Sequence, residues 1–401
     1  MEAILQLRRR YAFPVWIRFV GELVTGVTNG MLAPFLILYI NQKMGGDLFT
    51  STLIVGMGPL TEVLFTILGG GVTDRIGRKV AINLALFSQA FVMLGFMFAH
   101  TIIGFASLYI LNGVCRSLYI PAARAQIVDV TAENSRSEVF AVLSTIGSIG
   151  FTFGPALGLW VYATHPQLIF GFEAGALLLY GLIYLTFVKE TAPPKEPRAI
   201  KEKMDRPHEG LPNFFSHYRS VLILMVLMLP ISFFHAQTET NYRFYLEHLF
   251  TNYLSVLATL STVQSVLMLT LEIILVKWSE KFSMRLIVLL SYSCYILVAF
   301  IYGFSTALWP LVVAQLFLTM GQTIGLNHLQ RYVSQIAPAH ERGLYFALFG
   351  THWDLSRMIG PFVGSLIFVH FGGPVLFSVA AVFLMAGAVG QSIFLSNRVG
   401  G

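Results

Sequence analysis

The sequence predicts an all-α membrane protein with twelve transmembrane helices in two six-helix bundles, and three observations support this fold class. Hydrophobic residues make up 56% of the 401 residues, charged residues make up only 11%, and the mean hydropathy is +0.71. Soluble proteins carry roughly 25% charged residues, and a globule of this size has no interior for so much apolar surface. The other two observations are a series of long apolar stretches and an internal repeat. The same composition excludes disordered, collagen-like and disulfide-rich secreted folds.

Twelve stretches reach the length of about 20 mostly apolar residues that a membrane helix needs. In chain order they cover residues 14–40, 51–72, 80–99, 103–129, 138–163, 168–188, 221–247, 253–277, 285–304, 308–336, 342–370 and 374–396. Tilting accommodates the stretches that are longer than the bilayer is thick. The seventh is the most polar, because its second half contains Gln237, Glu239, Asn241 and Arg243.

The distribution of basic residues predicts the topology. If both termini are cytoplasmic, nineteen of the 26 Lys and Arg residues fall at or near inner ends, six lie within spans, and only Lys43 lies on an outer loop. Because such asymmetry is typical of multi-pass proteins, we expect a bacterial-type cytoplasmic membrane with both termini inside. The net charge of +6 then reflects topology, and no nucleic-acid partner is expected.

The N-terminal apolar run is interpreted as the first membrane helix rather than a signal peptide. It continues to Ile40, carries Arg18 and Glu22, and has no convincing small-residue cleavage site. Cys115 and Cys294 both fall within predicted spans, so no disulfide is expected.

The longest polar stretch, residues 189–219, predicts a cytoplasmic linker between an N-terminal bundle over 1–188 and a C-terminal bundle over 220–401. An offset of 206 residues relates the two halves. At this offset Arg136, Phe140, Ala141, Gly154, Pro155 and Gly158 correspond to Arg342, Phe346, Ala347, Gly360, Pro361 and Gly364. The offset also aligns Asp74-Arg75 with Glu280-Lys281 and Tyr39 with Tyr245. Parallel repeats of this kind bind substrate between the halves near mid-membrane.

The loop between the second and third spans reads Gly70-Gly71-Val72-Thr73-Asp74-Arg75-Ile76-Gly77-Arg78-Lys79. It resembles the signature G-x-x-x-D-R-x-G-R-K of the major facilitator superfamily, and the span count, linker and repeat extend the resemblance over almost the whole chain. The resemblance implies a secondary transporter that works by alternating access, with Gly70, Asp74, Arg75, Gly77, Arg78 and Lys79 as a conformational motif. A cytoplasmic Asp74 can favour the positive N-terminus of the eleventh helix. The alternative is a basic cluster that only fixes topology.

The fifth span contains Gly150, Gly154, Pro155 and Gly158, and resembles the motif of the family's antiporters except that Leu159 replaces a usual glycine. Glycine and proline in a membrane helix allow bending and close helix approach. We expect a bending or rocking element, and the alternative is a packing groove. The family's fourth-helix arginine is missing, because Tyr109 occupies its position; Arg116 and Arg124 on the same span are conjectural substitutes.

Glu22 is the most informative of the membrane charges. A charge at the bilayer centre costs on the order of 3 kcal/mol, so its retention suggests function. Its spacing of twelve residues before Pro34 resembles helix 1 of the family's multidrug/proton antiporters. A carboxylate there binds a proton or a cationic substrate, but poorly both at once. The alternative is a structural ion pair with Arg18 or with a fourth-helix arginine.

Other membrane acids extend the predicted site. Asp129 resembles an aspartate of proton-driven drug exporters, and together with Glu22 and Asp354 forms the predicted proton-coupling set. A solvated helix end for Asp129 and an intrahelical pair with Arg357 for Asp354 are the alternatives. Glu22, Glu62 and Arg116 form the predicted substrate-binding set. Glu173, Glu272, His328 and His352 are expected to be structural, the two glutamates solvated near helix ends and the two histidines satisfied within the core.

The predicted function is proton-coupled export of lipophilic, cationic compounds by alternating access. The expected partners are a small lipophilic substrate, protons and membrane lipid, and the protein is expected to be a monomer. No Walker-type loop or zinc spacing is present in the sequence, so we expect no enzyme activity and no cofactor or metal, with the proton gradient as the driving force. The alternatives are a symporter or exporter of a sugar, amino acid, lipid or other metabolite, and a transporter-like receptor or scaffold.

Overall fold

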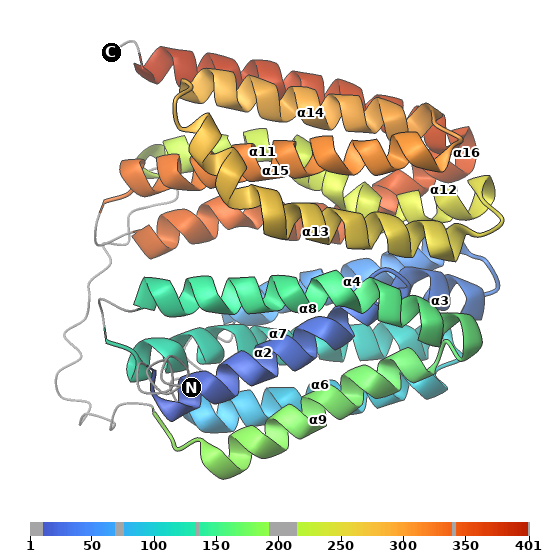
Figure 1. Cartoon of the computed structure of the whole chain (residues 1–401), viewed down its shortest axis with the longest axis vertical. Coiled ribbons are helices and arrows are strands. Elements are labelled where there is room, and N and C mark those ends of the chain that lie inside the picture. Colours follow the sequence, from blue (N-terminus) through green and yellow to red (C-terminus); the bar gives the residue numbers. More distant parts are fainter. Residues whose placement is uncertain (1–10, 69–75, 133–135, 192–214, 339–341, 400–401) are drawn as a thin grey trace. The chain divides into compact units, whose positions relative to one another are not determined.

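A computed structural model describes residues 11–68, 76–132, 136–191, 215–338 and 342–399 of the chain. These residues form helices and turns, with no strand among them. The first half contains α2 (Phe13–Leu32), α3 (Leu36–Lys43), α4 (Leu48–Leu68), α6 (Arg78–Phe98), α7 (Ile102–Val130), α8 (Arg136–Thr164) and α9 (Leu168–Phe187). The second half contains α11 (Arg219–Glu239), α12 (Asn241–Leu249), α13 (Tyr253–Ser279), α14 (Met284–Phe304), α15 (Leu308–Ile336) and α16 (Arg342–Val399), as Figure 1 shows.

The helices agree with the predicted all-α, twelve-span fold. Within the described residues, ten helices are long and apolar enough to cross a membrane, and α2 with α3 forms an eleventh span bent by 45°. The long helix α16 counts once among the ten, although it contains two helices joined at Gly372, whose φ of 81° is unfavourable for other residue types. The seventh predicted span is interrupted at Thr240, where α11 ends and α12 begins.

The internal repeat extends to the helix boundaries. Adding 206 to the bounds of α6 and α7 gives exact matches to α14 and α15. The same addition carries the first residue of α8 to the first residue of α16, and the break between α2 and α3 to the break between α11 and α12. The offset therefore describes the backbone of both halves and not only the motif residues that first suggested it.

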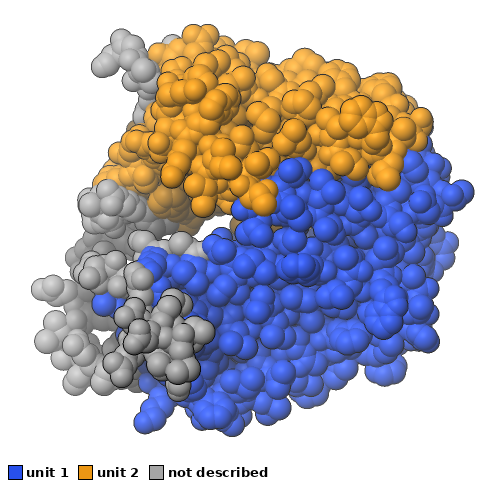
Figure 2. Space-filling model, in the orientation of Figure 1, with its two compact units in different colours: residues 1–192, 238–269, 361–370 blue, residues 193–237, 270–360, 371–401 orange. Residues whose placement is uncertain are grey.

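The chain forms two compact units (Figure 2). Unit 1 comprises residues 1–192, 238–269 and 361–370, and unit 2 comprises residues 193–237, 270–360 and 371–401. In unit 1, α2 packs along α8 and α9, α6 contacts α7 and α9, and α4 contacts α7. In unit 2, α14 packs against α15. Most of the predicted linker, 189–219, lies outside the described residues, and the division into sequence halves stays a prediction.

Large apolar side chains on the outside of the helices fit a lipid environment. Phe91, Ile103, Trp160, Trp309 and Phe371 are between 65% and 79% exposed. Water would penalise so much exposed apolar surface, whereas lipid tails are themselves apolar. The exposed surface and the helix lengths thus both indicate a multi-pass membrane protein.

Candidate functional site

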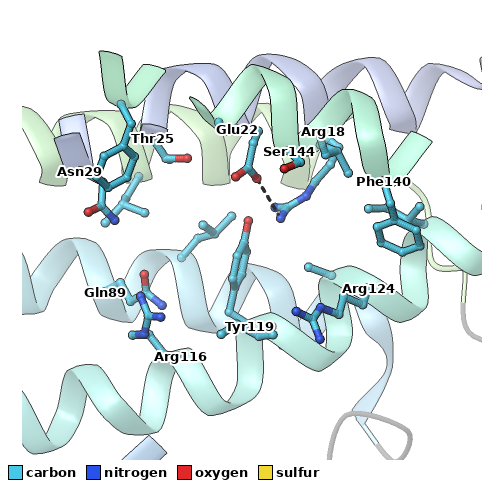
Figure 3. Close-up of a pocket in the computed structure, with 18 of the residues that line it drawn as sticks. Arg18, Glu22, Thr25, Asn29, Gln89, Arg116, Tyr119, Arg124, Phe140 and Ser144 are labelled. Carbon is cyan, nitrogen blue, oxygen red and sulfur yellow. Dashed lines mark ion pairs between the residues drawn. The ribbon is translucent and has the colours of Figure 1, made fainter. Parts of the chain in front are cut away.

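Unit 1 encloses a cavity of about 590 Å³ among α2, α6, α7, α8 and α9. Its wall combines apolar side chains with polar and charged ones, several of which point toward one another in Figure 3. The charged residues of the wall are Arg18, Glu22, Arg116, Arg124 and Glu173. The volume is in the range of small-molecule sites, so the cavity is the candidate functional site.

Arg18 and Glu22 form an ion pair on one side of the cavity, where Figure 3 marks the contact by a dashed line. Arg18 Nη2 lies 3.1 Å from Glu22 Oε2, one helical turn along α2. Arg18 Nη1 also donates to Tyr180 Oη at 3.1 Å, and its guanidinium lies 4.9 Å from the centroid of the Tyr119 ring. The intrahelical pair that the sequence offered as an alternative for Glu22 is therefore present, and it lies inside the cavity.

Arg116 and Glu62 form a second ion pair. Arg116 Nε on α7 donates to Glu62 Oε2 on α4 at 2.8 Å. The Arg116 side chain is 43% exposed and lines the cavity, whereas Glu62 is not among the lining residues. Arg124, further along α7, lines the same cavity (Figure 3). Of the three residues predicted to bind substrate, Glu22 and Arg116 therefore share the cavity wall, and Glu62 is connected to it through Arg116.

Glu173 is a cavity residue that the sequence prediction missed. We expected it to be solvated near a helix end, and this is wrong, because only 6% of the residue is exposed and it lines the cavity. It lies five residues inside α9, where α2 and α6 cover that helix. The repeat gives no signal for this burial, because the equivalent residue of the second half, Val379, is 44% exposed.

The other two predicted proton-coupling acids lie elsewhere. Asp129 Oδ2, near the end of α7, is 3.4 Å from Arg78 Nε at the start of α6. Asp354 is exposed on α16 in unit 2, and Arg357 places its guanidinium 5.8 Å from the Trp353 ring centroid. Neither acid lines the unit 1 cavity.

The described part of the loop motif forms the start of α6. The backbone N–H groups of Arg78 and Lys79 donate to the Glu190 carboxylate at 3.0 and 3.1 Å. Gly77 has a φ of 96°, and a Cβ at this position would lie 2.5 Å from Glu190 Oε2, so only glycine fits. Gly70, Asp74 and Arg75 lie outside the described residues.

The glycines of the fifth-span motif lie where α8 meets α2. A Cβ on Gly150 would lie 2.7 Å from Val27 N, and one on Gly154 would lie 2.5 Å from the Gly30 carbonyl carbon. A Cβ on Gly158 would lie 2.5 Å from Met31 O. The two helix backbones are therefore in direct contact along this line. Helix α8 continues through Pro155 from Arg136 to Thr164.

A residue of the second half also reaches the break in the first helix. Arg243 of α12 donates from Nη1 to the carbonyl oxygen of Ala33, between α2 and α3. Pro34 has no N–H group for an intrahelical bond, and Tyr109 of α7 is the buried aromatic neighbour of the guanidinium. All these residues belong to unit 1.

The histidines of unit 2 differ in how well they are satisfied. His328 Nε2 lies 2.8 Å from Ser279 Oγ, as expected for a core histidine. His352 is fully buried, and neither ring nitrogen has a hydrogen-bond partner among the described residues. The expectation of a satisfied core histidine is therefore wrong for His352, because its neighbours are the rings of Phe349 and Trp353.

Comparison with known proteins places this architecture in a family. The sequence profile of the Major Facilitator Superfamily matches residues 18–249 and 229–399. The chain belongs to this superfamily. Major Facilitator Superfamily members are transporters, and this agrees with the long membrane helices, the internal repeat and the cavity described above.

Relatives within the superfamily span nearly the whole chain. YhjO of Bacillus subtilis (strain 168), named as an uncharacterized transporter, is 43% identical over 94% of this chain and 92% of its own. A Na(+), Li(+), K(+)/H(+) antiporter of Planococcus maritimus is 27% identical, with 86% and 87% covered. Multidrug resistance protein 1 of Bacillus subtilis (strain 168) is 23% identical, with 86% and 88% covered.

A solved structure supports the fold. The crystal structure of a POT family transporter in complex with 5-aminolevulinic acid matches with a TM-score of 0.76. The match covers 96% of this chain and 97% of the transporter at 13% identity, and therefore reports the fold alone.

Proposed function

We propose that this transporter is a proton-coupled antiporter that exports lipophilic, cationic compounds by alternating access. The observation that carries the proposal is the unit 1 cavity, whose wall contains Glu22, paired with Arg18, and Arg116, paired with Glu62, within a mostly apolar bundle. The proton gradient is the proposed driving force, with no cofactor and no enzyme activity. The proposed partners are the substrate, protons and membrane lipid, without nucleic acid.

Each ion pair provides a chemical basis for exchange. A carboxylate paired with arginine gives up that contact when it is protonated or when another cation takes the arginine's place. A cationic substrate and a proton therefore compete for Glu22. The contacts with Tyr180 and Tyr119 hold the Arg18 side chain in place when Glu22 releases it. Mutually exclusive occupancy of one carboxylate is the minimum requirement for antiport.

The remaining cavity wall suits a flat lipophilic cation. Tyr119, Phe140 and Phe151 contribute rings to the wall, and aromatic faces attract cations while also providing apolar contact. The 590 Å³ volume is large enough for an organic molecule of drug size. The name of the multidrug resistance relative supports this substrate class.

Monovalent-cation/proton exchange is a second candidate, supported by the name of the Planococcus maritimus relative. The Arg18–Glu22 and Arg116–Glu62 pairs weigh against it, because a bare metal ion needs several free oxygen ligands. Transport of a metabolite, or a receptor role, has no specific support from the cavity.

The same proposal includes the membrane placement. We place the chain in a bacterial-type cytoplasmic membrane with both termini on the cytoplasmic side, as the positive-inside distribution indicates. We also propose that the transporter acts as a monomer. Cysteine accessibility at introduced terminal positions tests the orientation.

Proteoliposomes with an imposed pH gradient test the function. A pH-sensitive dye reports collapse of the gradient when ethidium is added, and Na⁺, Li⁺ or K⁺ replaces ethidium in parallel assays. The matched variants are Glu22→Gln in the cavity and Asp47→Asn, an exposed acid outside it. We expect collapse by ethidium in the wild type and Asp47→Asn, and loss of collapse in Glu22→Gln.

The other outcomes are equally specific. Collapse by Na⁺, Li⁺ or K⁺ without ethidium would favour the second candidate. No collapse by any cation would refute cation/proton antiport and direct attention to uncharged or anionic metabolites. Ethidium-driven collapse that persists in Glu22→Gln would remove Glu22 from the coupling path.

A further inference from the structure

Glu173 differs in its contacts from Glu22, the other glutamate of the cavity wall, and from Glu62, which pairs with Arg116. Glu22 and Glu62 have side chains that are 32% and 23% exposed, and each makes an ion pair with an arginine. Glu173 is 6% exposed, and its Oε2 has no hydrogen-bond partner among the described residues. Its polar neighbour on α2, Thr28, donates its hydroxyl to the backbone of its own helix, at Val24 O and Thr25 O.

We propose that Glu173 is a second group in this cavity, beside Glu22, that binds and releases a transported proton. The proposal rests on proton-coupled transport through the cavity and adds a second proton-carrying residue. A buried carboxylate with an unsatisfied oxygen is costly, whereas the protonated acid is neutral and supplies a donor. The environment of Glu173 therefore accommodates a bound proton better than the ion pairs around Glu22 and Glu62 do.

Arg116 connects this proton to the substrate. It lines the same cavity as Glu173, and in the described state it is bound to Glu62 at 2.8 Å. From the other packed elements, the charged groups of the cavity wall are Arg18 and Glu22 on α2 and Arg124 on α7. Helices α6 and α8 contribute only neutral side chains to the wall.

This arrangement gives a defined exchange step. A cationic substrate that binds Glu62 displaces Arg116, whose side chain is 43% exposed and has room to move in the cavity. An arginine that moves toward Glu173 favours the carboxylate, and the O–H proton passes to cavity water as its bonding pair stays on oxygen. Return of Arg116 to Glu62 after substrate release restores the neutral acid. Glu173 thus releases one proton for each cation that binds Glu62.

Infrared difference spectroscopy of the protein in lipid tests proton binding without requiring transport. The spectrum between acidic and alkaline buffer contains the C=O stretch of any carboxylic acid that titrates. We expect one component of this band to be present in the wild type and in Glu22→Gln and to be lost in Glu173→Gln. Glu173→Asp retains the acid and is expected to shift the band, which shows that the site is present in a folded protein. A band unchanged by Glu173→Gln would overturn the proposal.

Transport assays then separate this proposal from the proposed function. Glu173→Gln should lose gradient-driven ethidium accumulation but retain ethidium exchange between the two sides without a gradient, because the cavity still binds substrate. Wild-type vesicles that fail to move ethidium, with the Glu173 infrared band present, would refute the function and leave the proton site intact. Normal gradient-driven transport by Glu173→Gln would refute the coupling role.

Discussion

The charged wall of the unit 1 cavity and the equivalent surface of the second half share a backbone plan and differ in chemistry. At the offset of 206 residues, Arg18, Glu22, Glu62, Arg116 and Glu173 correspond to Leu224, Met228, Met268, Gln322 and Val379. Helix boundaries are kept between the halves, down to exact matches for α6 with α14 and α7 with α15. The repeat therefore determines the positions of the helices in both halves. At these five pairs of positions, only the first half has ionisable side chains.

The largest effect on stability is expected at the glycine contacts, which are tighter in the first half than at the equivalent position of the second half. We expect Gly154→Ala to destabilise the protein by about 3 kcal/mol, because overpacking of this kind forces backbone shifts. The new Cβ would lie 2.5 Å from the Gly30 backbone. At the repeat position, Gly360→Ala should cost less, since its Cβ first meets the side chain of Ala236 at 2.8 Å.

Thermal unfolding in detergent micelles, followed by tryptophan fluorescence, measures this difference. Gly175→Ala on α9 is the matched control, because no atom lies within 4 Å of its added Cβ. Equal losses for Gly154→Ala and Gly360→Ala would contradict the distinction.

A second prediction replaces the Arg18–Glu22 pair by the residues of the other half. Arg18→Leu alone should cost about 2 kcal/mol, less than for a fully buried pair, because Glu22 is left without its cation yet is partly exposed. The double variant Arg18→Leu/Glu22→Met copies Leu224 and Met228 and should recover most of the stability.

The double variant should nevertheless lose gradient-driven ethidium transport. Unfolding temperature and transport are measured on the same preparations. A double variant that is less stable than Arg18→Leu would contradict this prediction. It would show that the unpaired Glu22 carboxylate does not cause the lower stability of Arg18→Leu, and that the first half needs both side chains for its packing.

The third prediction concerns how equivalent helices begin. Ser283 is the N-cap of α14, and its side chain accepts a hydrogen bond from Leu286 N. The equivalent residue before α6 is Gly77, which has no side chain. There the Glu190 carboxylate accepts the hydrogen bonds from the first backbone N–H groups of the helix. Ser283→Ala and Glu190→Gln should each cost roughly 1 kcal/mol, as lost helix caps do.

Salt dependence distinguishes the two caps. The loss for Glu190→Gln should shrink at high salt, because a carboxylate at a helix N-terminus acts partly through charge. The loss for Ser283→Ala should not change with salt. Unfolding temperatures over a salt series measure both, and an identical salt response would contradict the assignment of Glu190 as a charged cap.

The smallest effect is expected at Asp47, which precedes α4. Hydrogen bonds from the backbone and side chain of Thr50 hold the pKa of the Asp47 carboxyl below its ordinary value. A lowered pKa in the folded state contributes stability above the unfolded value of about 3.9 and loses it as the pH falls. Asp47→Asn should therefore unfold slightly earlier at neutral pH and match the wild type in acid. A stability difference between the wild type and Asp47→Asn that grows as the pH falls would contradict this prediction.

Most of the fold could be predicted from the sequence because span length, charge asymmetry and repeat are encoded locally. The contacts that complete the site are not local. Glu190 is 112 residues from Arg78, and Arg243 is 210 residues from Ala33, so no spacing rule relates them. Ion pairing within one helix was foreseeable for Arg18 and Glu22, which are four residues apart.

Glu173 shows why depth along a helix is a poor guide to burial. Its place near the start of α9 suggested solvent, but α2 and α6 cover that part of the helix. Only the tertiary packing decides which face of a short helical segment is covered.

The glycine line between α2 and α8 has a mechanical consequence. With backbone against backbone at Gly30 and Gly154, no flexible side chains lie between the helices to absorb a sliding or separating displacement. The two helices are therefore stiffly coupled, so a displacement of α8 is transmitted to α2 and to the Glu22 that α2 carries.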